Sequence, residues 1–331
     1  MTDLDLTLDR ERLDRIRGGA AVVVDRPAVF RISGPGALTC LQGLFTNDLE
    51  QPGDESLTYG AMLTPKGMIV ADAWVARHGD GLTVIAPARG REAVRTIFQR
   101  GLPPRLAQAE DATDDAAVAW VLGGEGFRTL VQADVGAPEA AGRVLVHGAA
   151  AGDPLLVAVA PEGAPFAGLL AGAAHTVETA ALRVQLAGAL RGDESDLHAA
   201  RILAGWPALG AEIDEKTLPQ EVRYDEIGGV SYTKGCYTGQ ETVARVHFRG
   251  HVNRHLRGLR TTAPLPLPAG AQLVDETGKP VGDVRTATMS PRLGNIALAM
   301  VRREVPTGAT LDCRWAEGQA DVTAWPLPFP L

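Results

Sequence analysis

One short segment, residues 234–241, carries most of the residue types that can do chemistry, and it reads Lys-Gly-Cys-Tyr-Thr-Gly-Gln-Glu. Its glycines, Gly235 and Gly239, would let the backbone approach a ligand or take positive φ angles. Cys236 lies between them, beside Lys234 and close to an expected helix start. A neighbouring cation and a helix N-terminus both lower the pKa of a thiol. The segment therefore predicts a reactive thiolate, or a thiol presented to a cofactor or metal.

A second interpretation of Cys236 rests on the same residues. A lone cysteine in a glycine-containing turn is commonly buried and inert, and it packs as a small hydrophobic side chain. The other cysteines, Cys40 and Cys313, complete neither a CxxC pair nor a Cys–His spacing typical of zinc. No metal site is predicted, and from the residues alone both interpretations of Cys236 stay open.

The composition bounds the class of protein. The chain has 331 residues, 45% of them hydrophobic and 22% charged, which is enough for a sizeable core and two or three domains. Its net charge of −8 argues against a protein dedicated to coating nucleic acid. The odd cysteine count does not fit a disulfide framework, and the most apolar stretch, residues 155–174, is interrupted by prolines. We therefore expect a cytoplasmic protein with no membrane span.

Mixed strand and helix patterns precede the reactive segment. Residues 68–76 and 82–86 flank a Gly-Asp-Gly turn and predict a hairpin, and a helix is expected over 92–99. Further strands are expected at residues 20–24, 28–32, 118–122, 129–133, 144–147 and 155–159, and further helices at 165–174, 180–190 and 196–204. This mixture predicts an α+β class.

The pattern changes after residue 244. Gly- and Pro-rich turns separate short strands to the end of the chain, so residues 245–331 predict a small β-barrel domain. Residues 1–244 then form a body, which we divide into lobes at 1–110 and 111–244.

Arginines and histidines alternate with apolar residues over 245–257, which predicts a strand with one basic face. Five arginines occur between Arg245 and Arg260 without an acidic residue. Such a face could meet polyglutamyl folate, RNA or an acidic protein surface, or it could simply be solvated.

The residue 234–241 motif resembles the signature of the YgfZ-like proteins, relatives of the glycine-cleavage T-protein. Flanking stretches resemble the same family: A-R-I-L-A-G at 200–205, L-P-Q-E at 218–221, V-A-R at 243–245, R-G at 249–250, L-Q-G at 41–43, T-N-D at 46–48 and L-T-P-K-G at 63–67. The resemblance extends from about residue 28 to the end, and it is weakest between 109 and 180.

The resemblance implies a T-protein-like (GcvT-like), three-lobed folate-binding body with a C-terminal small β-barrel, and tetrahydrofolate, polyglutamylated forms included, in a central channel. Asp72 matches the acid that faces folate, and a carboxylate suits the amino-pyrimidine edge of a pterin. Arg201 matches an arginine that meets the folate glutamate carboxylate. Further cofactor-binding candidates are Gln220, Gly235, Tyr237, Gly239, Gln240, Glu241 and Arg245, and Cys236 and Lys234 are the catalytic candidates. Read without the resemblance, Asp72 could be a solvated strand residue, Arg201 a surface helix residue and Glu241 an acid in a helix first turn.

Three functions follow as expectations. The first is a folate-binding accessory protein that supports iron–sulfur cluster assembly or repair in client enzymes and affects tRNA modification indirectly, with Cys236 as the working thiol. The second is a folate-dependent aminomethyltransferase or methyltransferase. It is disfavoured because Ala71 and Ala73 flank Asp72 where T-proteins have consecutive acids. The third is direct tRNA binding by the basic face.

Overall fold

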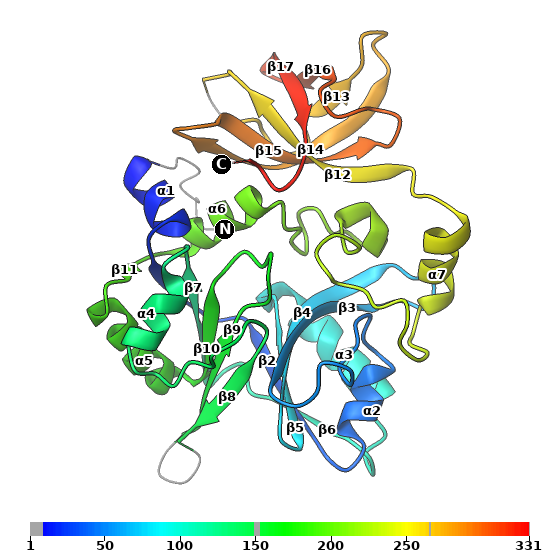
Figure 1. The fold of residues 1–331 in the computed structure, drawn as a ribbon. Helices are drawn as coiled ribbons and strands as arrows, with labels where there is room; N and C mark the ends of the chain where they lie inside the picture. Colours follow the sequence, from blue (N-terminus) through cyan, green and yellow to red (C-terminus); the bar gives the residue numbers. More distant parts are fainter. Residues whose placement is uncertain (1–8, 149–152, 265, 331) are drawn as a thin grey trace.

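Two β-sheets face each other in the computed structural model, which describes residues 9–148, 153–264 and 266–330 (Figure 1). One sheet has the order β3 (Ser56–Leu63), β4 (Ile69–His78), β5 (Gly81–Ala86), β2 (Ala28–Ser33) and β6 (Gln108–Asp111), with all neighbours antiparallel. The other has the order β11 (Leu190–Arg191), β1 (Ala21–Asp25), β7 (Ala116–Leu122), β10 (Gly168–Ala173), β9 (Leu155–Val159) and β8 (Val144–His147), and its pair β1–β11 is parallel. The hairpin predicted around residues 78–81 is confirmed as β4–β5.

Helices cover the outer face of each sheet, so the body has four layers. On one side, Leu41 of α2 (Ala37–Gln42) and Phe98 of α3 (Arg91–Gly101) share a buried cluster with Val75 of β4. On the other side, Leu130 of α4 (Gly126–Gln132) and Val184 of α5 (Ala174–Leu186) pack over the second sheet. The inner faces of both sheets meet in the largest buried cluster of the described residues.

The alternation of side chains along β4 places its carboxylate residue, Asp72, on one face of the sheet. Side chains on a strand point alternately to its two faces. Ala71, Ala73 and Val75 belong to the cluster beneath the helices, whereas Trp74 belongs to the cluster between the sheets. Asp72 shares the face of Trp74, so it lies between the two sheets.

The C-terminal strands close a barrel of their own. It consists of β12 (Arg254–Thr261), β13 (Gln272–Val274), β14 (Pro280–Ser290), β15 (Gly294–Arg302), β16 (Thr310–Trp315) and β17 (Gly318–Trp325), in the order β12-β15-β14-β13-β16-β17. Its interior is filled by aliphatic side chains and the buried Cys313. The expected α+β class with a C-terminal small β-barrel is confirmed.

The remaining helices are α1 (Arg10–Arg17), α6 (Glu194–Ala204) and α7 (Gln240–Arg249), and the 3-10 turns are η1 (Ala88–Gly90) and η2 (Pro219–Val222). α6 lies between the sheets and the barrel, and α7 lies at one edge of the molecule (Figure 1). Arg12 of α1 donates to Asp196 of α6 at 3.1 Å, and Asp196 is fully buried.

The strand predicted over residues 245–257 is wrong. Its first part continues α7 to Arg249, and β12 begins only at Arg254. Arg245 and Arg249 are four residues apart, a spacing that a helix face accommodates as well as a strand does. Gly250 ends the helix, and the expected division at 244/245 falls inside α7.

The secondary structure predicted for two short segments of the body is also wrong. Residues 129–133, expected as a strand, belong largely to α4, and residues 165–174, expected as a helix, contain β10. Short apolar runs do not distinguish a helix from a buried strand, because a few residues do not establish a period.

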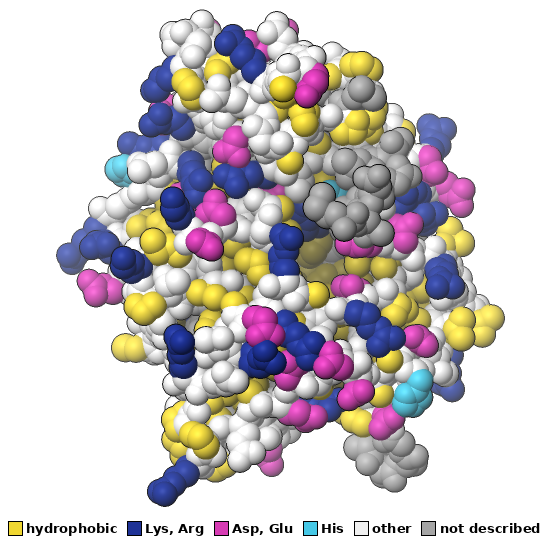
Figure 2. Space-filling model, turned by 180° about the vertical axis from the view of Figure 1, so that it is seen from behind, with side chains coloured by type: hydrophobic (Ala, Val, Ile, Leu, Met, Phe, Trp, Pro, Cys, Tyr) yellow, Lys and Arg dark blue, Asp and Glu magenta, His cyan; other side chains and the backbone are white. Residues whose placement is uncertain are grey.

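The face seen in Figure 2 mixes Lys and Arg side chains with Asp and Glu side chains over most of its area. None of the described helices is both long enough and apolar enough to cross a bilayer.

Candidate functional site

A cavity of about 240 Å³ lies between the two sheets and α6. Its charged groups are Asp25 of β1, Asp72 of β4 and Arg201 of α6, so two of the predicted site residues come together there. The rest of the lining is mainly apolar: Pro27, Tyr59, Ala73, Trp74, Ile85, Ala86, Pro87, Trp120, Leu122, Pro165, Phe166, Leu197, Trp206, Pro207 and Ala208. A concave apolar site with a few polar groups is typical of a small-molecule pocket.

Asp72 is the buried carboxylate of this cavity. It is only 7% exposed, so its interpretation as a solvated strand residue is wrong. The Tyr59 hydroxyl donates to Oδ2 at 3.0 Å, whereas Oδ1 is buried and has no hydrogen-bond partner among the described residues. Burial raises the pKa of Asp72 to about 6, and the Tyr59 hydrogen bond and the charge of Arg201 oppose that rise. The carboxyl group is therefore mostly ionised at neutral pH and has one oxygen available to a ligand.

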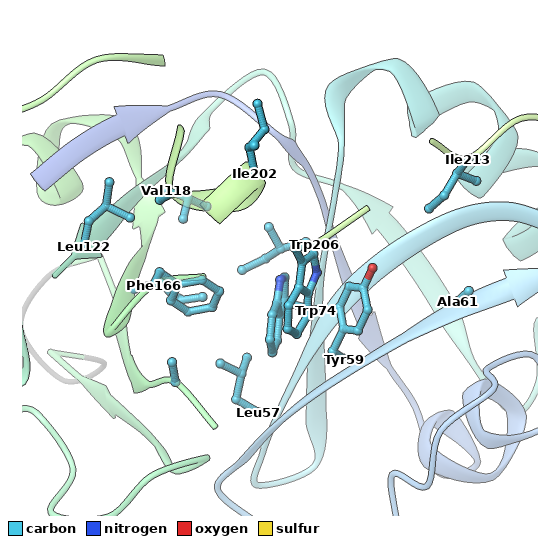
Figure 3. Close-up of a cluster of buried hydrophobic side chains, with 14 of the residues drawn as sticks. Leu57, Tyr59, Ala61, Trp74, Val118, Leu122, Phe166, Ile202, Trp206 and Ile213 are labelled. Atoms are coloured by element: carbon cyan, nitrogen blue, oxygen red, sulfur yellow. The ribbon is translucent and has the colours of Figure 1, made fainter. Parts of the chain in front are cut away.

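Aromatic rings form the walls beside this carboxylate, and the sequence interpretation missed them (Figure 3). The rings of Trp74 and Trp206 stack with centroids 5.9 Å apart and planes 16° apart, and Tyr59 lies 4.9 Å and 5.0 Å from them. Phe166 packs edge-on to Trp74 at 4.9 Å and to Trp120 at 4.8 Å. Such walls suit a flat heterocycle, because ring faces offer large apolar contact with defined geometry. Three of the chain's five tryptophans meet here, which spacing along the chain does not reveal.

Arg201 is held by a buried ion pair. Its Nη1 donates to Glu212 at 2.8 Å and to the Trp206 carbonyl at 2.8 Å, and Glu212 is fully buried. Thr286 of the barrel lies 3.3 Å from the other guanidinium nitrogen and also donates to Glu212. The side chain is 13% exposed, so its interpretation as a surface arginine is wrong. Arg201 thus links α6, the following segment and the barrel, and borders the cavity.

Lys234 is buried and fastens its loop to the N-terminal half of the chain. Its ammonium donates to the carbonyls of Gln42, Phe45 and Asn47 at 2.7, 2.7 and 2.8 Å, and it lies 5.1 Å from the centroid of the buried Tyr237 ring. Burial lowers the pKa of Lys234 to about 8, against the raising effect of nearby acids. Gln42 belongs to the L-Q-G stretch, Asn47 to the T-N-D stretch, and Phe45 lies between them, so these motifs and the K-G-C-Y motif form one structural unit.

The rest of the loop is tied down on both sides of the thiol. The Thr238 amide donates to the Gly43 carbonyl at 3.0 Å. Gly239 has φ +84°, and a Cβ there would lie 2.6 Å from the Thr64 carbonyl oxygen, so glycine is required. Cys236, between these anchors, is exposed. Its interpretation as a buried turn cysteine is therefore wrong.

The other predicted residues lie outside the cavity lining. Gln240 donates to the Gly235 carbonyl at 3.5 Å, and Glu241 and Arg245 are exposed on α7, Glu241 in its first turn. Gln220 is buried and donates to a backbone carbonyl of α7 at 2.9 Å, which holds that helix on η2. The predicted site therefore divides into a cavity with Asp72 and Arg201 and a surface loop with Cys236. Among the described residues no group of three or more His, Cys, Asp or Glu side chains could hold a metal ion.

Comparisons with known proteins agree with this architecture. A family model described as the GCVT N-terminal domain matches residues 17–136, and one described as the glycine cleavage T-protein C-terminal barrel domain matches residues 254–329. The crystal structure of the glycine cleavage system aminomethyltransferase T from Bartonella henselae superposes with a TM-score of 0.82 at 16% sequence identity, covering 97% of this chain and 89% of that chain. The predicted T-protein-like fold is confirmed.

Curated relatives match over most of the chain. The tRNA-modifying protein YgfZ of Cronobacter sakazakii is 28% identical over 317 residues, which cover 92% of this chain and 91% of that protein. The tRNA-modifying protein YgfZ of Klebsiella pneumoniae is 30% identical over 259 residues, which cover 76% of this chain and 75% of that protein.

Proposed function

The chain belongs to the YgfZ family, and from that membership we propose that it is a folate-binding accessory protein that supports iron–sulfur cluster assembly or repair in client enzymes and thereby affects tRNA modification. Tetrahydrofolate is its proposed ligand and Cys236 its proposed working thiol.

The observation that carries the folate proposal is the orphaned oxygen of Asp72 in an aromatic-walled cavity. A buried acceptor without a partner costs free energy, and a ligand donor that reaches it removes that cost. The amino-pyrimidine edge of a pterin carries such donors, and Trp74 and Trp206 offer apolar ring faces to its plane. The residues therefore fit a reduced pterin such as that of tetrahydrofolate. When bound, tetrahydrofolate would supply one-carbon carrier chemistry.

Arg201 is the proposed partner of the folate glutamate carboxylate, or of a polyglutamate tail. Three of its donors already serve Glu212, the Trp206 carbonyl and Thr286, and the guanidinium has two further N–H groups for a second carboxylate. Its ion pair with Glu212 would hold the guanidinium in place for that contact.

The thiol proposal rests on the exposure of Cys236 between two anchored points. Thiolates bind iron and exchange with sulfur, and an exposed thiol on a fixed loop can reach a partner's cluster. In cells that lack the protein, Cys236→Ala should fail to restore the activity of iron–sulfur enzymes, whereas Cys40→Ala should restore it. Full restoration by Cys236→Ala would remove the thiol role.

Anaerobic calorimetric titration with tetrahydrofolate tests the pocket. We expect saturable micromolar binding, accompanied by a change in tryptophan fluorescence because three tryptophans line the cavity. Heat without saturation at millimolar ligand would reject the folate proposal.

A folate-dependent aminomethyltransferase is the second candidate, and one observation favours it. Asp72, with a pKa of about 6, can accept or release a proton near neutral pH. Turnover with tetrahydrofolate and a lipoyl-bound aminomethyl donor, lost in Asp72→Asn and kept in Cys236→Ala, would establish this activity in place of the accessory role.

A further inference from the structure

The outward face of α7 combines an exposed aromatic side chain with two arginines. Arg245, Phe248 and Arg249 are spaced by three and four residues, so they share one face of the helix. Phe248 is 67% exposed, and both arginines are exposed. The opposite face is anchored, because Val243 is fully buried and its carbonyl accepts from Gln220.

Neighbouring rings hold Phe248 in place. The His247 ring lies 4.8 Å from it at 89°, and the Tyr232 ring stacks on His247 with centroids 3.6 Å apart. The Tyr232 hydroxyl in turn donates to Asp225. An aromatic side chain that is rigid before binding loses little conformational entropy on contact with a partner.

The two arginines form a cationic site in an acidic protein. Within the described ranges neither Arg245 nor Arg249 makes an ion pair, although the chain carries a net charge of −8. Asp225 and Glu226 are engaged elsewhere, Asp225 with Tyr232 and His247, and Glu226 with Arg223 at 2.9 Å. Glu241, four residues before Arg245 on the same helix, is exposed and forms no ion pair within the described ranges. At the left edge of Figure 2, where α7 lies after the turn from Figure 1, Lys and Arg side chains are prominent.

This face is also close to the exposed thiol. α7 begins at Gln240, whose side chain reaches back to Gly235 at 3.5 Å, beside Cys236. From Gln240 to Phe248 the helix rises about 12 Å, at about 1.5 Å per residue. A single short segment of a partner could therefore contact Phe248 and the loop of Cys236 together.

We propose that Arg245, Phe248 and Arg249 form a docking face for an acidic segment of a partner protein, which binds its carboxylates to the two arginines and an apolar side chain to Phe248. Arginine and aromatic residues are the side chains that most often dominate protein interfaces. An RNA backbone fits less well, because binding to RNA without sequence readout draws on many phosphate contacts, whereas this face offers two arginines in a chain of net charge −8. The link to Cys236 rests on the proposed function, whereas the docking itself does not.

Fluorescence anisotropy with a defined probe tests the docking. The probe is a fluorescein-labelled peptide that alternates glutamate with leucine, and its glutamine counterpart reports the neutral background. The double substitution Arg245→Glu and Arg249→Glu should lower the affinity for the glutamate peptide about tenfold or more, equivalent to about 1.4 kcal/mol. Phe248→Ala should lower the affinity for both peptides. Urea unfolding of each variant shows whether a loss of peptide binding reflects a loss of the fold. Tetrahydrofolate titration of each variant tests the folate proposal separately from the docking.

The chain offers matched controls on its opposite side. Arg183 and Arg191 are exposed and lie on α5 and β11, across the molecule from α7 in Figure 1, and Phe127 of α4 is a partly exposed aromatic residue. Arg183→Glu with Arg191→Glu makes the same change in net charge, and it should leave peptide affinity unchanged, as should Phe127→Ala. Equal losses in the control and test variants, or tighter binding of oligouridine with the same arginine dependence, would overturn the proposal.

A thiol-exchange rate tests whether the docked segment reaches Cys236. The glutamate peptide then ends in a cysteine activated as a pyridyl disulfide. The Cys236 thiolate attacks the peptide sulfur, a new disulfide joins them, and pyridine-2-thione leaves with the electron pair and a proton. In a Cys40→Ser background the glutamate peptide should react about tenfold faster than the glutamine peptide, because docking raises its effective concentration. The difference in rate between the two peptides should disappear with Arg245→Glu and Arg249→Glu, and Cys236→Ser should abolish the reaction. Equal rates for both peptides would refute the inference that one docked segment reaches both the docking face and Cys236.

Discussion

The hydroxyl of Tyr59 donates a 3.0 Å hydrogen bond to Oδ2 of Asp72, and Oδ1 of the same carboxylate has no partner in the described structure. Tyr59 also lies 3.2 Å from the hydroxyl of Tyr224. Because a carboxylate can only accept, the single Tyr59 proton is directed to Asp72, and Tyr224 must donate to Tyr59. The pair of tyrosines therefore orients one oxygen of Asp72 and leaves the other for a ligand.

Replacement of Asp72 by asparagine should weaken tetrahydrofolate binding by about 10- to 100-fold, since a hydrogen bond to a charged acceptor contributes about 1.5–3 kcal/mol. Asparagine keeps the size of the side chain but replaces one acceptor oxygen with a donor. Calorimetry measures the loss, and Asp80→Asn in the exposed β4–β5 turn is the control. Unchanged affinity in Asp72→Asn would exclude the carboxylate as a folate contact.

The same substitution should stabilise the protein without ligand, and the gain should depend on pH. The folded-state pKa of Asp72 is about 6, raised from 3.8 mainly by burial, so the folded state binds a proton more tightly than the unfolded state. The stability that this proton contributes is present below about pH 4 and is lost as the pH rises through about 6, a cost of about 3 kcal/mol. Asp72→Asn should therefore exceed the wild type in urea unfolding at about pH 8 and match it near pH 4. A gain in the free energy of unfolding that grows as the pH falls would contradict a raised pKa for the buried Asp72 carboxyl group.

Lys234→Met should destabilise the fold by about 3 kcal/mol, because methionine fills similar space but leaves three carbonyls without their charged donor. Urea unfolding measures the loss. Lys66→Met, at an exposed position, should change the free energy of unfolding by less than about 0.5 kcal/mol. Similar stabilities for the two variants would mean that the carbonyl contacts of Lys234 do not hold the loop.

The two glycines beside Cys236 should respond differently to alanine. Gly239→Ala should lower the free energy of unfolding by about 1–3 kcal/mol, because its φ of +84° and the nearby Thr64 carbonyl both exclude a Cβ. Gly235→Ala should be nearly neutral, since a Cβ there meets no atom within 4 Å. Thermal unfolding compares them, and a larger loss for Gly235→Ala would reverse this assignment.

The sequence predicted elements best where turn chemistry and alternation agreed. The β4–β5 hairpin has a glycine-containing turn between two apolar runs, and the barrel strands are separated by similar turns. The strand prediction for the basic run after residue 244 was wrong because alternating and helical spacing coincide over a few residues. The segment forms α7, which is held against η2 by the hydrogen bond from Gln220.

The candidate site was predictable only in part. Asp72 and Arg201 came from family resemblance, and the structure brings them to one cavity. Trp120 and Phe166 could not be found, because Phe166 packs on Trp74, and Trp120 on Phe166, through contacts distant in the sequence. Local patterns predict which face of a strand is buried, but not which faces meet.

The clamp of Lys234 on Gln42, Phe45 and Asn47 joins positions almost two hundred residues apart. Contacts of such sequence separation carry a loop-closure entropy cost that opposes their formation. A chain that is truncated, or misfolded in either half, would thus hold Cys236 on an unanchored loop. In the proposed role, presentation of the Cys236 thiol to a client therefore requires that both halves of the chain have folded and come together.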